Sequence, residues 1–143
     1  MEYSDFVISH LILEICATMG TITKILILGA SGSIGSQSID VIDKSNGDFI
    51  ITSISVGNNT RIISSLIKKH PSIKDIYLID NQRKKYYQNK YPHINFYSKK
   101  DGLSSLINHA DYDMVINALV GFVGLKPTID ALKRNKIVNV KAA

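Results

Sequence analysis

The fold of this chain is set by one short segment, Lys24-Ile25-Leu26-Ile27-Leu28-Gly29-Ala30-Ser31-Gly32-Ser33-Ile34-Gly35. Its opening apolar run is typical of a buried parallel strand. Glycines then recur at every third position, and a helix is expected from about 33 to 44, with Ile34, Val41 and Ile42 on its buried side. A strand, a glycine-rich turn and a helix in this order form the first half of a β-α-β unit.

The same alternation continues along the chain. Asn46-Gly47 supplies the left-handed geometry that helix exits favour. Further strands are expected at 49–56, 76–79, 94–97, 114–118 and from 137, and further helices at 60–70, 81–90, 103–109 and around Pro127, where Ile129 and Leu132 should face inward. Apolar strands joined by helices predict an α/β fold, namely a doubly wound, mostly parallel Rossmann-like sheet with helices on both faces.

Residues 1–22 differ from the rest of the chain, because they carry acidic side chains but no Lys or Arg and show no strand–helix alternation. We expect an appended N-terminal leader, either weakly structured or a single helix, with Met19 as a plausible natural start. A helix that binds a partner is the alternative. Residues 23–143 are then expected to form one domain, truncated at its C-terminal end.

The formal net charge is +5 and the isoelectric point about 9.3. The cations are scattered in short groups such as Arg83-Lys84-Lys85, and no basic face is interleaved with aromatic residues. This pattern favours a solvated surface and a phosphorylated ligand over nucleic-acid binding.

The chain has one cysteine, Cys16, so it can form no internal disulfide, and a reducing compartment is expected. Its best apolar run, residues 6–22, is interrupted by His10 and Glu14 and lacks a basic flank. The run is therefore a poor signal peptide and a poor membrane span. We expect a cytoplasmic protein without membrane contact.

The glycine-rich turn has the spacing of a phosphate-binding turn. Gly29 permits the tight turn, Gly32 lets a pyrophosphate approach the backbone, and Gly35 lets the helix pack close to the strand. The helix start offers unpaired N–H groups and about half a positive charge, to which Ser31 and Ser33 add hydroxyl donors. The Gly-Lys-Ser/Thr ending of a nucleotide-hydrolysing loop is missing, which favours a dinucleotide site; a glycine turn without a ligand is the alternative.

The end of the second strand distinguishes NAD from NADP. A carboxylate there would accept hydrogen bonds from the ribose 2′-hydroxyl and repel a 2′-phosphate. The chain instead has Gly57, Asn58 and Asn59, followed by Arg61, which could offer charge to a phosphate or could be a solvated helix residue. The segment favours NADP(H).

Three segments in this order resemble the 1-deoxy-D-xylulose 5-phosphate reductoisomerase family. The first, Gly29-Ala30-Ser31-Gly32-Ser33-Ile34-Gly35-Ser36-Gln37-Ser38-Ile39-Asp40-Val41-Ile42, is similar to the family's opening signature. The second, Val56-Gly57-Asn58-Asn59, is similar to its A-G-x-N turn. The third, residues 117–128, resembles its A-[IL]-V-G-x-x-G-L-x-P-T segment. The resemblance covers about residues 23–138.

The family converts 1-deoxy-D-xylulose 5-phosphate to 2-C-methyl-D-erythritol 4-phosphate for isoprenoid synthesis, with NADPH and a divalent metal (Mg or Mn). The resemblance implies that residues 31–34 hold the pyrophosphate, that residues 57–59 surround the 2′-phosphate, and that the turn at Ala118 lies beside the nicotinamide half. The expected cofactor-binding residues are Gly29, Ser31, Gly32, Ser33, Ile34, Gly57, Asn58, Asn59, Arg61 and Ala118.

Two departures from the family pattern matter. Many members carry Lys or Arg at the position of Asn58, which leaves Arg61 as a substitute cation. The family also continues with an A-N-K-E loop, whereas this chain ends Asn139-Val140-Lys141-Ala142-Ala143. The metal-binding carboxylates and the sugar-phosphate pocket of the family lie beyond that point, so no catalytic and no metal-binding residue is assigned.

Three functions remain as hypotheses. One is an NADPH-binding enzyme fragment without turnover of its own, and another is a stand-alone dinucleotide-binding or redox-sensing module. The third is a semialdehyde dehydrogenase-like reductase, which is disfavoured because its catalytic cysteine should follow the fold and Cys16 precedes it. A truncated domain should also expose apolar surface, so self-association or a homodimer is expected.

The other titratable side chains have structural interpretations. Asp111 and Asp113 stand before the fifth strand, at the end opposite the ligand crevice of such a sheet, and are expected to be turn and capping residues. His70, His93 and His109 fall at element boundaries without metal spacing, and we expect them on the solvated surface.

Overall fold

The computed structural model of the chain describes residues 21–119 and 121–140. Most of the expected leader, including Cys16, lies outside these residues. Within them, the strands are β1 (Thr23–Leu28), β2 (Phe49–Val56), β3 (Asp75–Leu78), β4 (Asn95–Tyr97), β5 (Met114–Asn117) and β6 (Ile137–Val140). The helices are α2 (Ser33–Asp43), α3 (Ile62–Lys69), α4 (Asn81–Lys90), α5 (Leu103–His109), the short 3₁₀ helix η1 (Gly121–Gly124) and α6 (Leu125–Lys133).

The strands form one sheet in the order β4-β3-β2-β1-β5-β6, and every neighbouring pair is parallel. The chain builds the sheet outward from β1 to β4 and then crosses back to place β5 on the other side of β1. The strand order therefore reverses between β1 and β5. In an open α/β sheet, the carboxyl ends of the strands at such a reversal leave a crevice for a ligand.

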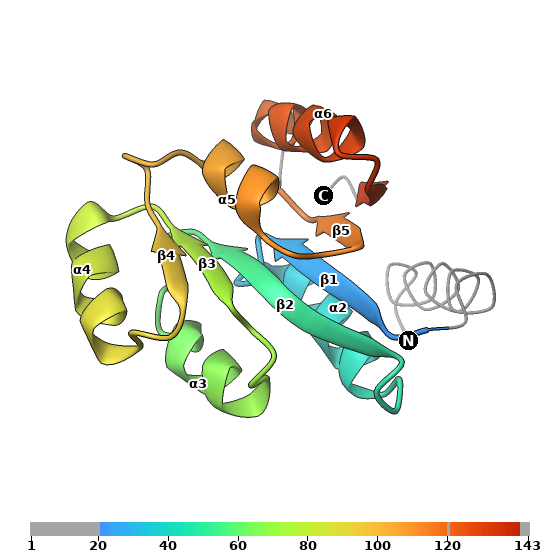
Figure 1. Cartoon of the computed structure of the whole chain (residues 1–143), viewed down its shortest axis with the longest axis horizontal. Coiled ribbons are helices and arrows are strands. Elements are labelled where there is room, and N and C mark those ends of the chain that lie inside the picture. Colours follow the sequence, from blue (N-terminus) through green and yellow to red (C-terminus); the bar gives the residue numbers. More distant parts are fainter. Residues whose placement is uncertain (1–20, 120, 141–143) are drawn as a thin grey trace.

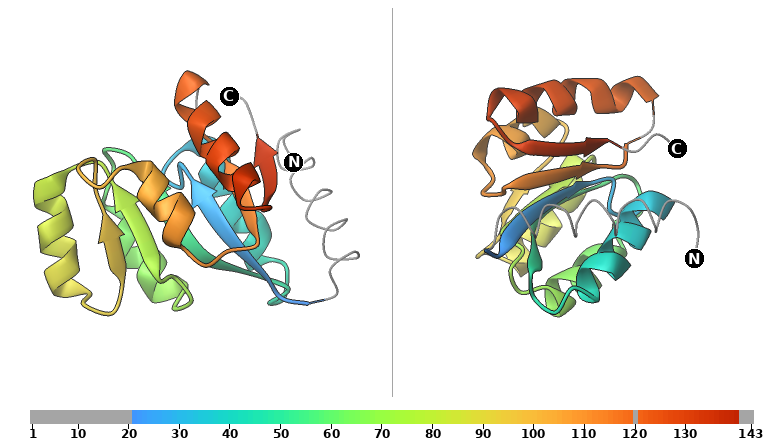
Figure 2. Two further views of the ribbon diagram at one scale, coloured as in Figure 1. Left: turned by 45° about the horizontal axis from the view of Figure 1, so that its top comes forward. Right: turned by 90° about the vertical axis from the view of Figure 1, so that its right-hand side faces the viewer.

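Helices cover both faces of the sheet (Figures 1 and 2). α2 and α3 lie on one face, and α5 and α6 lie on the other. Two apolar cores result: the larger one includes Ile27, Ile39 and Ile63, and the smaller one includes Leu28, Leu106 and Ala131. The predicted doubly wound α/β fold is confirmed.

Element boundaries agree closely with the pattern of the sequence. The expected strand at 49–56 and the helices at 81–90 and 103–109 coincide with β2, α4 and α5. Asn46 and Gly47 have φ values of 56° and 86°, which is the left-handed geometry expected after the first helix. Pro127 lies in the first turn of α6.

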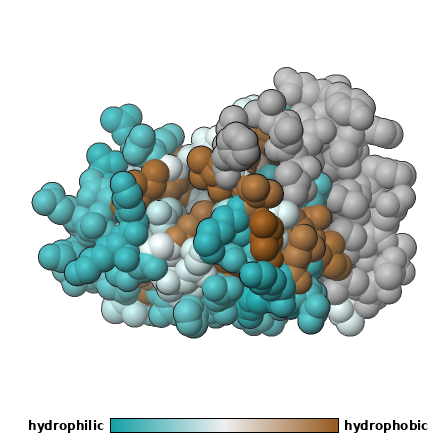
Figure 3. All heavy atoms as spheres, turned by 90° about the horizontal axis from the view of Figure 1, so that it is seen from above, coloured by the Kyte–Doolittle hydropathy of each residue, from teal (hydrophilic) through white to brown (hydrophobic). Residues whose placement is uncertain are grey.

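The expectation that Ile129 and Leu132 face inward is wrong. Their exposed fractions are 42% and 54%, whereas Pro127 and Ala131 of the same helix are buried. Residues four apart share one face of a helix, and α6 turns the small face of Pro127 and Ala131 toward the sheet. Seen from the side of α5 and α6, apolar side chains gather in the middle of the surface, with polar side chains to their left and below them (Figure 3).

Candidate functional site

The glycine-rich turn lies at the carboxyl end of β1, where the strand order reverses. Gly29 has φ +81°, a conformation that side chains disfavour, and its carbonyl oxygen accepts the Gly32 N–H at 3.1 Å. A Cβ on Gly35 would stand 2.2 Å from the Gly29 oxygen and 2.8 Å from the Ala30 Cα. The glycine at position 35 therefore lets α2 start directly against the turn.

The first turn of α2 is open to an anion. Gly32 occupies the N-cap position with extended backbone angles, and no side chain caps the helix there. Gly32 and Ser33 are exposed, while Ser31 and Ile34 are half-buried. An uncapped helix start presents its N–H groups and the positive end of the helix dipole to a ligand.

Ser55, near the end of β2, holds the glycine turn in place. Its Oγ accepts the Gly29 N–H and its carbonyl oxygen accepts the Ala30 N–H, both at 2.9 Å. The Gly57 N–H reaches the Ser31 Oγ at 3.5 Å, so the turns after β1 and β2 meet. Sequence reasoning missed Ser55, although a serine within an apolar strand pointed to a hydrogen-bonding role; the structure shows that it is buried.

The turn after β2 is exposed at Asn58, Asn59 and Arg61. The Asn59 Oδ1 accepts the Arg61 backbone N–H at 3.3 Å, as in a local turn. A side chain that the sequence did not indicate also reaches this turn: Arg83 of α4 donates from Nη1 to the Asn58 carbonyl oxygen at 3.0 Å and to the Thr60 Oγ1 at 3.3 Å.

The turn after β5 forms the other wall of the crevice. The half-buried Ala118 donates its N–H to the Leu28 carbonyl oxygen at 3.0 Å, and its own carbonyl oxygen would stand 3.2 Å from a Cβ on Gly29. The buried Asn117 fixes the following loop by donating from Nδ2 to the Gly124 oxygen and the Thr128 Oγ1, each at 2.8 Å. The predicted site residues thus come together from three strand ends, at one edge of the sheet.

A cleft of about 340 Å³ opens between these turns and the starts of α5 and α6. Apolar side chains dominate its walls, which are lined by Gly29, Ser55, Val56, Gly57, Tyr77, Ile79, Leu103, Ser104, Leu119, Val123, Lys126 and Pro127. Burial raises the pKa of Tyr77, so its phenol stays protonated and neutral. At the rim, the Lys126 Nζ lies 2.9 Å from both the Ser104 Oγ and an Asp130 oxygen.

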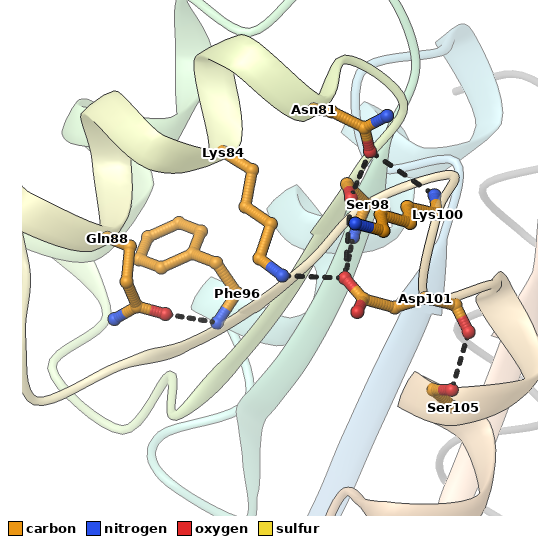
Figure 4. Close-up of polar contacts among 8 residues, drawn as sticks. All are labelled: Asn81, Lys84, Gln88, Phe96, Ser98, Lys100, Asp101 and Ser105. Carbon is orange, nitrogen blue, oxygen red and sulfur yellow. Dashed lines mark hydrogen bonds and ion pairs between the residues drawn. The ribbon is translucent and has the colours of Figure 1, made fainter.

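Polar contacts around the loop after β4 hold α4 and α5 at this edge (Figure 4). An Asp101 oxygen lies 2.7 Å from the Lys84 Nζ and accepts the Ser98 N–H at 2.9 Å. The hydrogen bond from Lys84 is the main reason that the pKa of Asp101 is lowered. Asn81 bonds both Ser98 and the Lys100 N–H, which ties the start of α4 to the same loop.

At the opposite edge of the sheet, Asp111 and Asp113 make structural contacts with Lys24, as expected of turn and capping residues. An Asp111 oxygen lies 2.7 Å from the Lys24 Nζ, and an Asp113 oxygen accepts the Lys24 backbone N–H at 2.9 Å.

His93 and His109 are exposed, as predicted. The prediction for His70 is wrong: only 11% of its side chain is exposed, because it lies against the end of α2, with its Nε2 3.3 Å from Asp43.

No group of three or more His, Cys, Asp or Glu side chains that could hold a metal ion occurs in residues 21–119 and 121–140. Among the helices that the structure describes, none is long and apolar enough to cross a membrane.

A family model described as 1-deoxy-D-xylulose 5-phosphate reductoisomerase matches residues 25–141. The enzyme of that name from Listeria monocytogenes serotype 4b (strain F2365) is 31% identical over 117 residues, which are 82% of this chain and 30% of the relative. The one from Clostridium botulinum (strain Eklund 17B / Type B) is 34% identical over 117 residues, 79% of this chain and 30% of the relative. The chain thus spans about 30% of the length of the curated relatives that it matches.

Solved structures with the same description have the same fold. The 1-deoxy-D-xylulose 5-phosphate reductoisomerase from Zymomonas mobilis in complex with NADPH matches with a TM-score of 0.73 at 20% identity, over 85% of this chain and 32% of that one. A structure of DOX-P reductoisomerase in complex with magnesium gives a TM-score of 0.74 at 21% identity, over 85% of this chain and 31% of that one.

Proposed function

The chain belongs to the 1-deoxy-D-xylulose 5-phosphate reductoisomerase family, and from this premise we propose that residues 23–143 are an NADPH-binding domain. The pyrophosphate is proposed to lie at the open start of α2, against Gly29, Ser31, Gly32, Ser33 and Ile34. The observation that carries the proposal is the uncapped helix start at the reversal of strand order, packed onto the glycine turn through Gly35.

The two halves of the coenzyme then have separate places. The adenine ring is proposed to enter the apolar cleft beside Val56, Tyr77 and Leu103, where the walls suit a flat aromatic ring. Gly57, Asn58 and Asn59, with Arg61 nearby, are proposed to surround the 2′-phosphate. Ala118 is proposed to lie beside the nicotinamide half, because it follows β5 on the other side of the strand-order reversal.

The described residues do not fit a magnesium site, although three solved structures of similar fold are complexes with magnesium. They bring together no metal-binding group of three side chains, and Asp111 pairs with Lys24 at the edge away from the crevice. NADPH supplies a hydride when bound, and this part of the chain is proposed to bind and orient it. We assign no catalytic residue. For the whole enzyme we also propose a sugar-phosphate substrate, a homodimer and a cytoplasmic location.

Titration of the chain with NADPH and NADH, followed by nicotinamide fluorescence, tests the proposal. NADPH should bind, and Gly32→Val should weaken binding of both coenzymes at least about tenfold, because the new side chain occupies the space of the pyrophosphate. The fold should tolerate this change, since the nearest atom to a Cβ at position 32 is the Gly29 oxygen, at 3.5 Å.

Asp111→Asn, at the opposite edge of the sheet, is the control and should bind like the unmodified chain. A chain that binds neither coenzyme, or a Gly32→Val variant that binds both as tightly as before, would contradict the proposal.

A further inference from the structure

Arg83 brings a positive charge to the turn after β2. It lies in the first turn of α4, where the Asp80 Oδ1 caps the helix by accepting the N–H groups of Gln82 at 2.8 Å and of Arg83 at 3.3 Å. From there the guanidinium reaches back to the Asn58 oxygen at 3.0 Å and the Thr60 Oγ1 at 3.3 Å. Its Nε lies 3.8 Å from the second Asp80 oxygen. These contacts orient the guanidinium plane beside the turn.

The turn needs a cation if it is to hold a 2′-phosphate. Such a group carries between one and two negative charges near neutral pH, while residues 56–60 hold no charged side chain. Arg61 follows directly, but only its backbone N–H is fixed to the turn, through Asn59. Among the residues that the structure describes, Arg83 is the cation whose side chain contacts the turn itself.

Arg83 is not what keeps the turn folded. The buried Tyr87, one helical turn further along α4, donates its hydroxyl hydrogen to the Thr60 carbonyl oxygen at 3.0 Å. The ion pair of Lys84 with Asp101 holds α4 itself to the loop after β4. The Arg83 side chain is about half exposed and its guanidinium has five N–H donors, so it can bond a ligand oxygen while it keeps its contact with Asn58.

We propose that Arg83 selects NADPH over NADH by pairing with the 2′-phosphate at the turn of Gly57, Asn58 and Asn59. The inference rests on the proposed function and assigns its specificity to a residue of α4. A planar guanidinium forms strong, charge-assisted hydrogen bonds with phosphate oxygens. Asp80 offsets this charge only in part, because its nearer oxygen stands 3.8 Å from Nε, beyond hydrogen-bond distance, while its other oxygen caps α4.

Dissociation constants of NADPH and NADH, measured for the full chain and three variants, test the inference. Arg83→Gln should weaken NADPH binding roughly ten- to hundredfold, the usual range for a lost charge-assisted hydrogen bond. NADH binding should change less than about twofold, since NADH has no 2′-phosphate. Lys85→Gln removes the same charge from an exposed position of the same helix and should change neither constant. Arg61→Gln should lower NADPH affinity less than Arg83→Gln does.

The two coenzymes separate this inference from the proposed function. If the unmodified chain binds neither, the proposed function itself fails. If it binds both equally well, or if Arg83→Gln weakens both by the same factor, the domain binds a dinucleotide but Arg83 does not select the phosphate. A larger loss of NADPH affinity in Arg61→Gln would also overturn the assignment to Arg83.

Discussion

Gly32 and Gly35 belong to one turn, but they should respond differently to the same substitution. Gly35→Ser places a Cβ 2.2 Å from the Gly29 oxygen, so the turn or α2 must shift, at a cost of roughly 1–3 kcal/mol in the free energy of unfolding. Gly32→Ser meets no atom closer than 3.5 Å and puts a favoured residue at the N-cap. Its free energy of unfolding should stay the same or rise. Urea unfolding of both variants measures the difference, and equal losses would contradict the packing role of Gly35.

His70 should make stability depend on pH. Burial lowers its pKa below the ordinary value of 6.5, although the nearby charge of Asp43 acts in the opposite direction. The unfolded imidazole therefore binds a proton more readily than the folded one. The contribution of His70 to the free energy of unfolding should be fully present above pH 6.5. It should be lost as the pH drops through the lower, folded-state pKa.

His70→Gln should remove this part of the pH dependence when unfolding is followed between about pH 7.5 and pH 5, a range that spans the usual histidine pKa. His93→Gln, at an exposed position, is the control and should leave the dependence unchanged. An unmodified chain whose stability does not fall below pH 6.5 would contradict the role given to His70.

For the helices and strands, the sequence predicted what depends on local pattern. The alternation of apolar strands and helices located β2, α4 and α5 to the residue, and the glycine spacing located the turn between β1 and α2. The wrong face of α6 has a different origin. Apolar Ile129 and Leu132 suggested an inward face, but the space against the sheet admits the smaller face of Pro127 and Ala131. Which face of a helix is buried depends on its neighbours as well as on hydropathy.

The candidate site was predictable only where its residues lie close together in one short segment of the chain. Gly29, Gly32 and Gly35 could be recognised because chain geometry restricts such a turn to a fixed spacing. Arg83 could not, because it meets Asn58 from a position 25 residues away, on a polar helix whose sequence gives no signal. The same applies to Asn117, whose hydrogen bonds to Gly124 and Thr128 form only once β5 and α6 are placed together.

Exposed apolar surface and net charge have opposite effects on the association of copies of this protein. Val123, Leu125, Ile129 and Leu132 are exposed within a short stretch that includes α6, which favours association of copies. The net charge of +5 keeps copies apart, and salt screens that repulsion. We therefore expect self-association that grows with protein concentration and with salt.

Light scattering at increasing concentration, in low and high salt, measures this association. The double variant Ile129→Lys/Leu132→Glu leaves the net charge unchanged and should stay monomeric, because it interrupts the apolar surface of α6. Its free energy of unfolding should change by no more than about 0.5 kcal/mol, since both positions are exposed. Tyr86→Gln, an exposed aromatic position on α4, is the control and should associate like the unmodified chain. If the unmodified chain remains monomeric at high concentration and high salt, charge repulsion is not what keeps copies apart. The exposed apolar surface of α6 then does not mediate self-association, and the prediction is wrong.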